Sequence, residues 1–445
     1  MNILLVYPTC LDEHDRPIKY RQAFFPPLAL AILAGLTPPP HTVTVVNEIV
    51  EPLAFDAPYD LVGITAMTSQ SERAYQIADA FRARGVPVVL GGIHPTALPE
   101  EAQGHADAVV VGEAEPVWEQ VLDDCEQRRL RPVYQATSFP ALDFPARPRW
   151  DRLNLKIYPR AFNMPLPDMP FYATRGCPFA CAFCSVSKFF GRRYRVRPIA
   201  HVLRELDELP TPYRFFVDDN LAGDVDYARE LFRAMARRPA RFAWGSQISA
   251  TVLDTPDVLE LAAKAGCVAL IVGLESLNPA SLRHANKRFN HVERYAELFA
   301  RLWKLRITPY PNLMFGFDDD PPDQCCRTVA FLRRHHVRDA LFWVLTPYPG
   351  TDLFAQMQQE GRIEHRRWSR YDAAHVVFRL KHQTPAQFYA TYWQAYQQFY
   401  SWRNFAAFAL HCRLRHLPGA LLGKSIVRRK IYACEHPTAL GTGAP

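Results

Sequence analysis

The chain lacks any apolar run long enough to cross a bilayer. Its longest strongly apolar stretch near the start, residues 28–36, is about half of the roughly 18 to 20 residues that a membrane helix needs. Residues 1–7 lead straight into a strand pattern, without the basic start and small-residue cleavage site of a secretory leader. We therefore expect a globular protein of the cytoplasm with no transmembrane helix.

Cysteine is scarce, and the positive charge is not concentrated. Ten cysteines in 445 residues are too few for a disulfide scaffold, and only three of them stand close together. The remaining interior cysteines lack metal-ligand spacing, so we expect ordinary core thiols at Cys10, Cys125, Cys267, Cys325 and Cys326. The formal charge of +7 is scattered over many arginines. Scattered positive charge is weak evidence for the binding of a polyanion, and we expect no nucleic-acid substrate.

Short apolar runs alternate with helical patterns in the first part of the chain. The runs cover residues 2–7, 43–47, 61–65, 86–90 and 108–111. Helical patterns lie between them, for example at residues 27–34 and 71–84. This alternation predicts a doubly wound, Rossmann-like α/β domain over residues 1–128. Such a parallel sheet binds ligands beyond the carboxyl ends of its strands.

A second alternating series follows a proline-rich stretch. Residues 129–168 have little periodicity and are interpreted as a linker. Six strand patterns then occur near residues 171–174, 214–217, 242–247, 268–272, 308–315 and 340–345. Because a closed TIM barrel needs eight such repeats, we expect an open, partial (β/α)6 TIM-type barrel over residues 169–370.

The end of the chain lacks strand patterns, and residues 371–445 are predicted to form a C-terminal helical extension, with the clearest pattern over 385–408. Its final stretch is basic, with Arg413, Arg415, Lys424, Arg428, Arg429 and Lys430. Two interpretations stay open: a basic amphipathic helix in peripheral contact with a membrane, or a solvated helical cap.

Three cysteines lie directly after the first strand of the second series. Cys177, Cys181 and Cys184 are spaced by four and three residues, which lets their thiolates surround one metal centre. A structural zinc site needs a fourth ligand nearby, and the next histidine is His201. A 4Fe-4S cluster ordinarily has four cysteines, so three leave one iron open to the amino and carboxylate groups of a methionine moiety. A zinc loop or unrelated core cysteines are the alternatives.

The Cys-x3-Cys-x2-Cys spacing, with Phe183 before the last cysteine, resembles the signature of the radical S-adenosylmethionine superfamily. The resemblance implies a 4Fe-4S cluster on the three cysteines that cleaves S-adenosylmethionine to a 5′-deoxyadenosyl radical. It also implies an external electron donor such as flavodoxin or ferredoxin.

Polar residues end the next predicted strands of the barrel. In the superfamily that the chain resembles, residues at such strand ends contact S-adenosylmethionine, and Phe183 touches the adenine mainly through its backbone. This carries over to Asp218, Asn220, Gln247, Glu275 and Ser276. The alternative is that they are strand-end caps and loop formers. The four arginines after the cluster loop, Arg192, Arg193, Arg195 and Arg197, could neutralise the cluster, bind anionic substrate groups or form a solvated turn.

Glycines and hydroxyls end three predicted strands of the first domain, in residues 65–70, 91–96 and 111–115. A dinucleotide site would need a Gly-x-Gly-x-x-Gly turn after the first strand, and the sequence there is Tyr7-Pro8-Thr9-Cys10. Nicotinamide and flavin are therefore disfavoured.

These loops, with Phe25-Pro26-Pro27-Leu28 and later segments to about residue 405, resemble the cobalamin-binding branch of the superfamily, and most of all the group with hopanoid methylases. The resemblance implies a cobalamin-binding first domain. Its predicted contacts are Thr65, Ser69, Gly91, Gly92, His94, Gly112 and Glu113. Where other corrinoid proteins have Asp-x-His-x-x-Gly, this chain has Asp12, His14 and Pro17, so we interpret His14 as a surface residue.

The implied activity is methylation of an unactivated carbon on a small or lipid-like substrate. A radical oxidoreductase or cyclase without methyl transfer, and a non-enzymatic corrinoid carrier or sensor, are the alternatives. Phe342, Trp343, Tyr348, Tyr371 and Phe378 could form an apolar substrate pocket, or they could be plain core.

Overall fold

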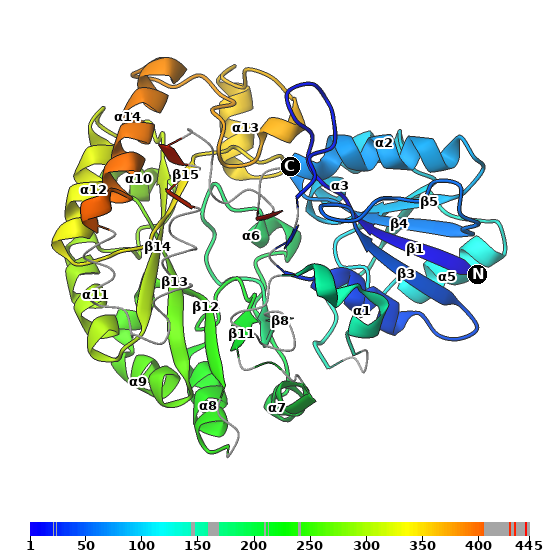
Figure 1. Ribbon diagram of the computed structural model, residues 1–445, viewed down its shortest axis with the longest axis horizontal. Helices are drawn as coiled ribbons and strands as arrows, with labels where there is room; N and C mark the ends of the chain where they lie inside the picture. The colour runs from blue at the N-terminus through cyan, green and yellow to red at the C-terminus, as the bar shows by residue number, and fades with distance from the viewer. Residues whose placement is uncertain are drawn as a thin grey trace.

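The computed structural model consists of two α/β bodies that lie side by side (Figure 1). It describes residues 1–20, 22–23, 25–143, 147–158, 169–208, 211, 213–238, 242–404, 427–428, 431–432 and 441–442. None of the helices in these ranges combines the length and the apolar character that a bilayer crossing requires.

The first body is built on a six-stranded parallel sheet with the order β3-β1-β4-β5-β6-β7. Its strands are β1 (Asn2–Tyr7), β3 (Thr42–Asn47), β4 (Leu61–Thr65), β5 (Val88–Gly91), β6 (Ala108–Val111) and β7 (Val133–Gln135). Alternate residues of β1 pack on opposite faces: Ile3 and Leu5 face α1 and α5, whereas Leu4 and Val6 face α2. The covering helices are α1 (Leu28–Leu36), α2 (Ser71–Arg82), α3 (Ile93–Ala97), α4 (Pro99–Gln103) and α5 (Trp118–Glu126). The predicted doubly wound fold is confirmed.

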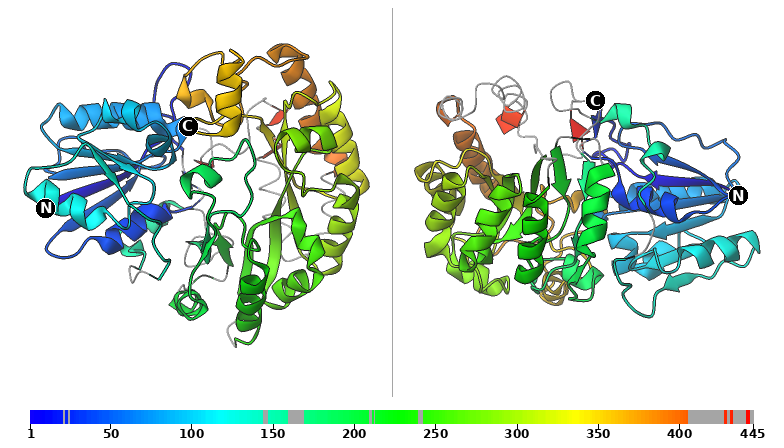
Figure 2. Two further views of the ribbon diagram at one scale, coloured as in Figure 1. Left: turned by 180° about the vertical axis from the view of Figure 1, so that it is seen from behind. Right: turned by 90° about the horizontal axis from the view of Figure 1, so that it is seen from below.

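The second body is a parallel sheet of six strands in the spatial order β15-β14-β13-β12-β11-β8. The strands are β8 (Met169–Phe171), β11 (Tyr213–Phe216), β12 (Ala243–Ser249), β13 (Cys267–Glu275), β14 (Thr308–Phe315) and β15 (Leu341–Val344). Because β8 and β15 are the two edges and do not pair, the sheet is a half-barrel, as predicted. Figures 1 and 2 show its helices along the outer side.

Those outer helices are α7 (Ile199–Glu208), α8 (Val225–Ala236), α9 (Pro256–Lys264), α11 (Tyr295–Lys304) and α12 (Gln324–Arg334). Two further helices, α10 (Pro279–His284) and α13 (Asp352–Gln359), follow strand ends, and α14 (Pro385–Phe399) packs beside α12. The aromatic residues Phe342, Tyr371 and Phe378 are fully buried in the core of this body, whereas Trp343 and Tyr348 keep partial exposure.

The stretch interpreted as a linker is partly structured. Strand β7 lies within residues 129–168 and pairs with β6, so the first sheet extends past residue 128. The short 3-10 turns Trp150–Arg152 and Leu155–Ile157 follow it. The domain boundaries themselves stay a prediction. Of the basic residues predicted near the end, only Arg428 belongs to the described residues, where its guanidinium lies over the rings of Trp402 and Tyr432.

Candidate active site between the two domains

The three cysteines lie on a loop that leaves the half-barrel and returns to it. Strand β9 (Thr174–Arg175) and strand β10 (Arg195–Val196) pair antiparallel and close the base of this loop. Between them lie the cysteines and helix α6 (Val186–Phe189). We call residues 174–196 the cluster excursion.

Backbone contacts fix the base of the cluster excursion to the end of β11. The Asp218 carboxylate accepts hydrogen bonds from the backbone N–H groups of Ala173 and Thr174 and from the Thr174 hydroxyl, at 2.6 to 3.1 Å for Oδ1. Asp219 accepts one from the Gly176 N–H at 3.1 Å. Gly176 has a φ of +87°, and a Cβ there would lie 2.0 Å from the Arg193 carbonyl oxygen, so only glycine fits.

These bonds change the interpretation of Asp218. It was predicted to contact S-adenosylmethionine, but its carboxylate is fully buried and bonded to the chain. Burial raises the pKa of Asp218 to about 7 and that of Asp219 to about 6, partly offset by these hydrogen bonds. These hydrogen bonds hold the segment that leads into Cys177, and a contact of Asp218 with S-adenosylmethionine stays a prediction.

Glu275, at the end of β13, forms a buried ion pair at the same edge of the sheet. The Lys287 ammonium donates to its Oε1 at 2.6 Å, and the Asn312 amide approaches its Oε2 at 3.4 Å. Glu275 has a φ of +65°, a left-handed conformation that costs a residue with a side chain free energy. Burial raises the pKa of the Cys177 and Cys181 thiols, and the Lys287 charge offsets part of that rise.

The other residues predicted for S-adenosylmethionine lie around these groups. The Asn220 amide lies 4.0 Å from the Cys177 sulfur, and its oxygen accepts from the Ser249 N–H. The Ser276 hydroxyl accepts from the Asn278 N–H. Gln247, on β12, and Phe183, on the cluster loop, are both half-buried. All of them come from strand ends or loops at one edge of the half-barrel.

The donor set suits a cluster on three cysteines. Burial raises the pKa of the Cys181 thiol to about 11 and of Cys184 to about 12, so a metal charge is needed to turn them into thiolates. Across the described residues, no three His, Cys, Asp or Glu side chains are close enough to share a single metal ion. A 4Fe-4S cluster needs no such convergence, because each cysteine binds a different iron.

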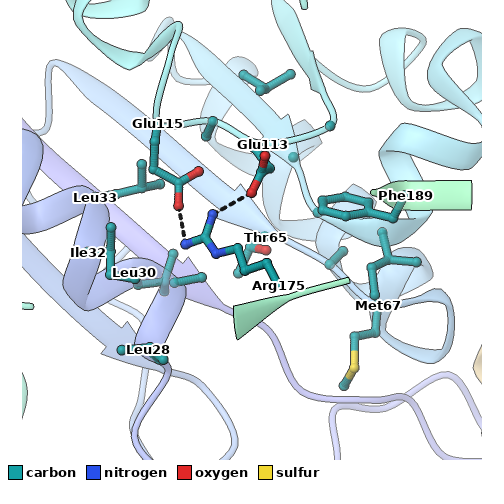
Figure 3. Close-up of a pocket in the computed structure, with 18 of the residues that line it drawn as sticks. Leu28, Leu30, Ile32, Leu33, Thr65, Met67, Glu113, Glu115, Arg175 and Phe189 are labelled. Atoms are coloured by element: carbon teal, nitrogen blue, oxygen red, sulfur yellow. Dashed lines mark hydrogen bonds and ion pairs between the residues drawn. The ribbon is translucent and has the colours of Figure 1, made fainter. Parts of the chain in front are cut away.

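A cavity of about 410 Å³ lies between the first sheet and the cluster excursion (Figure 3). Thr65, Gly91, Gly92 and Gly112, all predicted cobalamin contacts, line it at the ends of β4, β5 and β6. Gly92 has a φ of +101°, and a Cβ there would lie 2.8 Å from the Ala66 backbone, so the loop needs glycine. The volume falls in the usual range of ligand pockets, and the missing side chains are what open it.

The opposite wall of this cavity belongs to the cluster excursion. Thr174 and Arg175 line it from before the cysteines, and Val186, Phe189 and Phe190 line it from after them. Two sites that the sequence suggests separately therefore share one wall.

Arg175 joins the two domains inside the cavity. Its guanidinium lies between Glu113 and Glu115, at 2.5 Å from each, as Figure 3 shows. Arg195, which is opposite Arg175 in the β9–β10 ribbon, reaches Glu113 as well, at 2.8 Å. All four side chains are largely buried. Glu113 lines the cavity and pairs with both arginines, and its contact with cobalamin stays a prediction.

His94 and Ser69 lie outside the residues that line the cavity. His94 is fully buried, and its Nε2 lies 3.2 Å from Glu101 Oε1. Trp368 of the second domain donates to the same oxygen at 2.9 Å, while its backbone N–H donates to Glu72 at 3.0 Å. His94 thus belongs to a second contact between the domains. His14 is exposed, as predicted, and none of the described residues that line the cavity is a histidine or cysteine.

Sequence reasoning assigned no individual role to Arg175, Glu115 or Lys287. Arg175 lies just before the cysteine motif, and Glu115 ends the segment Gly112-Glu113-Ala114-Glu115. The local signal for each is that it is a charged residue within such a segment. Lys287 gave no signal, because its partner Glu275 is twelve residues away and meets it only through the fold.

Comparisons with known proteins match both halves of the chain. The radical SAM superfamily matches residues 171–332, and the B12 binding domain matches residues 12–122. Two curated relatives come from Chlorobaculum tepidum. Bacteriochlorophyllide d C-8(2)-methyltransferase is 31% identical over 88% of each chain, and bacteriochlorophyllide d C-12(1)-methyltransferase is 34% identical over 80% of this chain and 78% of its own.

The expected likeness to hopanoid methylases is also found. Hopanoid C-2 methylase of Rhodopseudomonas palustris is 26% identical over 82% of this chain and 71% of its own. Among solved structures, the cobalamin-dependent S-adenosylmethionine radical enzyme OxsB shares the fold, with a TM-score of 0.71 over 97% of this chain and 72% of its own at 12% identity. The chain belongs to the cobalamin-binding radical S-adenosylmethionine methyltransferases, whose cofactors are a 4Fe-4S cluster, S-adenosylmethionine and cobalamin.

Proposed function

We propose that this enzyme transfers a methyl group to an unactivated carbon of a flat, largely apolar substrate of the tetrapyrrole class. The shared wall carries the methylation part of the proposal: residues on both sides of the three cysteines line the cavity that the glycine strand ends open. When bound, the cluster supplies the electron that cleaves S-adenosylmethionine, and cobalamin supplies the methyl group. The chain's own task is to hold these two sites as neighbours.

Individual roles follow from the contacts. We assign the cluster to Cys177, Cys181 and Cys184, and the amino-acid end of S-adenosylmethionine to the surroundings of Glu275 and Lys287, where opposite charges suit a zwitterion. Asn220, Gln247 and Ser276 supply further polar contacts at the same edge. Asp218 is a positioning residue, because its oxygens hold the backbone before Cys177.

The substrate class rests on the relatives and on the inner face of the half-barrel. Two relatives are named for methylation of bacteriochlorophyllide d. Along β14, Tyr310, Asn312 and Met314 keep partial exposure, while the alternate residues are buried under the helices. Trp343 donates to Asn312, which places both on the inner face.

Phe215 of β11 also keeps partial exposure, and Phe25 of the first domain stacks on it at 5.5 Å. Together with Tyr310, Met314 and Trp343, these rings give the inner face an aromatic, largely apolar character. Such surfaces favour a planar ring system over a charged or strongly polar substrate.

The test uses anaerobically reconstituted enzyme with dithionite, hydroxocobalamin and S-adenosylmethionine deuterated at its methyl group. A bacteriochlorophyllide-type chlorin and a hopanoid are offered in parallel, and products are identified by mass spectrometry. We expect the intact deuterated methyl group on the chlorin, and none when Cys181 is replaced by serine. Label on the hopanoid instead of the chlorin would overturn the tetrapyrrole class in favour of hopanoids. Formation of 5′-deoxyadenosine without label transfer in either arm would favour an oxidoreductase or cyclase.

Reductive cleavage also needs an electron from outside the chain. We propose a small protein donor of the flavodoxin or ferredoxin kind, as the resemblance to the radical S-adenosylmethionine superfamily implies. Peripheral contact of the basic C-terminal stretch with a membrane stays a separate prediction.

A further inference from the structure

The outer surface around the cysteine loop is basic. Five exposed cationic side chains surround it, and we call them the cluster-side basic surface: Lys188, Arg192, Arg193, Arg283 and Arg288. Three belong to the cluster excursion, and two belong to the end of α10 and the loop after it.

Hydrogen bonds make these segments one continuous surface. The Ala182 N–H donates to the Ala285 carbonyl at 2.9 Å, and the Asn286 amide donates to the Ala180 carbonyl at 2.7 Å. The half-buried rings of Phe179 and Phe289 stack at 3.8 Å between the two segments. Residues 283–289 are therefore packed directly on the loop that carries the cysteines.

Helix α13 closes the third side. The Leu353 N–H donates to the Ala182 carbonyl at 2.9 Å, and Asp352, at the start of the helix, pairs with Lys188 at 2.5 Å and with Arg192 at 3.8 Å. His284 contacts Gln356 of the same helix at 3.3 Å. The three elements thus meet around the thiols.

Positive charge dominates this surface. The acidic side chains that pair with it in the described residues are Asp352 and, through His284, Asp319. Arg193, Arg283 and Arg288 take no part in these two acidic contacts and are exposed to solvent. Beneath them, Lys287 adds a buried positive charge that acts on Cys177 and Cys181. The surface that overlies the cysteine loop is therefore predominantly basic, with Asp352 and Asp319 as its acidic partners.

We propose that the cluster-side basic surface docks a small acidic electron-carrier protein of the flavodoxin or ferredoxin kind. This deepens the proposed function, because it rests on reductive cleavage of S-adenosylmethionine in the same site. The carrier loses one electron, and that electron breaks the C5′–S bond of the sulfonium to give methionine and a 5′-deoxyadenosyl radical. Redox partners use small interfaces, and complementary charge steers their encounter and raises the association rate.

The experiment compares two reductants on the holoenzyme. The rate of 5′-deoxyadenosine formation is measured with reduced flavodoxin and, separately, with dithionite, a small ion that needs no docking surface. The variant is the double charge reversal Arg283→Glu and Arg288→Glu. The matched control is Arg237→Glu, an exposed arginine at the end of α8, which leads into the opposite end of β12.

We expect the double variant to lose at least about tenfold of its flavodoxin-supported rate at low salt, the scale of electrostatic steering. Its dithionite-supported rate and iron content should stay at the wild-type level, and the loss should shrink as salt is raised. The control should change neither rate. Equal losses with both reductants, or no loss with flavodoxin, would overturn the docking surface.

The proposed function fails in a distinguishable way. If the wild-type enzyme forms no 5′-deoxyadenosine with dithionite, the chemistry itself is wrong. If it does so and the charge reversal leaves the flavodoxin-supported rate unchanged, only the docking surface is wrong.

Discussion

The two parallel sheets both carry candidate site residues at the carboxyl ends of their strands, but these residues differ in kind. The strands of the first sheet end in small residues, Thr65, Gly91, Gly92 and Gly112, and a cavity opens there. The strands of the second sheet end in Asp218 and in Glu275 with its partner Lys287, and these charged groups are bonded to the chain or to each other.

The difference shows two ways in which a strand end can serve a large cofactor. A sheet edge that leaves space for a cofactor needs small residues. The shape of the cavity and its backbone groups then determine which ligand it binds. An edge that holds a charged loop must have its polar groups satisfied in advance, because an unpaired buried charge costs several kcal/mol. Arg175 is where the two edges meet, since it belongs to the cluster excursion and binds two carboxylates of the first domain.

The largest effect is expected from breaking that junction. Replacing Arg175 by methionine leaves Glu113 paired with Arg195 alone and removes the ion pair of Glu115 with Arg175, so we expect a loss of about 3 kcal/mol in unfolding free energy, as for other buried pairs. Urea denaturation of the apo-protein, followed by tryptophan fluorescence, measures it.

Arg175→Lys should restore part of this stability, because an ammonium can still pair with one carboxylate. Arg192→Met, on the exposed part of the same excursion, is the control and should shift the midpoint little. An unchanged midpoint for Arg175→Met would mean that other contacts join the domains.

A smaller effect, confined to the first sheet, is expected from Gly92→Ala. The added Cβ would meet the Ala66 backbone at 2.8 Å in a left-handed conformation, a cost on the order of 2 kcal/mol. We expect weaker binding of hydroxocobalamin, measured by absorbance titration, with unchanged iron loading. Gly104, at the end of α4, does not line the cavity and has no positive φ, and an added Cβ there would lie 3.2 Å from the Glu101 carbonyl oxygen, so Gly104→Ala is the matched control. Equal weakening in both variants would contradict the role of the Gly92 turn.

The effect expected from Asp218→Asn depends on pH and is smallest in acid. Because burial raises the pKa of Asp218 to about 7 from an ordinary value of about 4, the folded state favours the protonated carboxyl. Its contribution to stability is therefore complete below about pH 4 and is lost as pH rises to about 7. The variant should match the wild-type midpoint below about pH 4 and gain on it by pH 8. Parallel pH profiles for the two proteins would show that Asp218 titrates normally.

The sequence predicts the framework well, because buried strands and amphipathic helices carry strong periodicity. The bounds predicted for β1, β4, β6 and β14 are those observed. The spacing of the three cysteines and the glycine strand ends are local signals too, and the glycines do line the cavity.

What the sequence could not reveal is how a polar side chain is used. Asp218, Glu113 and His94 resemble ligand contacts by position, yet each is bonded to a partner 45, 62 or 7 residues away. Only the fold brings such partners together. The roles of the individual site residues stay predictions until the variants are measured.

Two sets of contacts join the domains. Arg175 and Arg195 form ion pairs with Glu113 and Glu115, and Trp368 donates hydrogen bonds to Glu72 and Glu101. We expect these contacts to slow the departure of a large molecule that is seated between the domains. Exchange of the bound corrinoid should therefore be slow even if its individual contacts are weak. The fraction of enzyme that is loaded should then depend on when the corrinoid is supplied. Supplying the corrinoid while the polypeptide is still folding should fill more molecules than adding it afterwards.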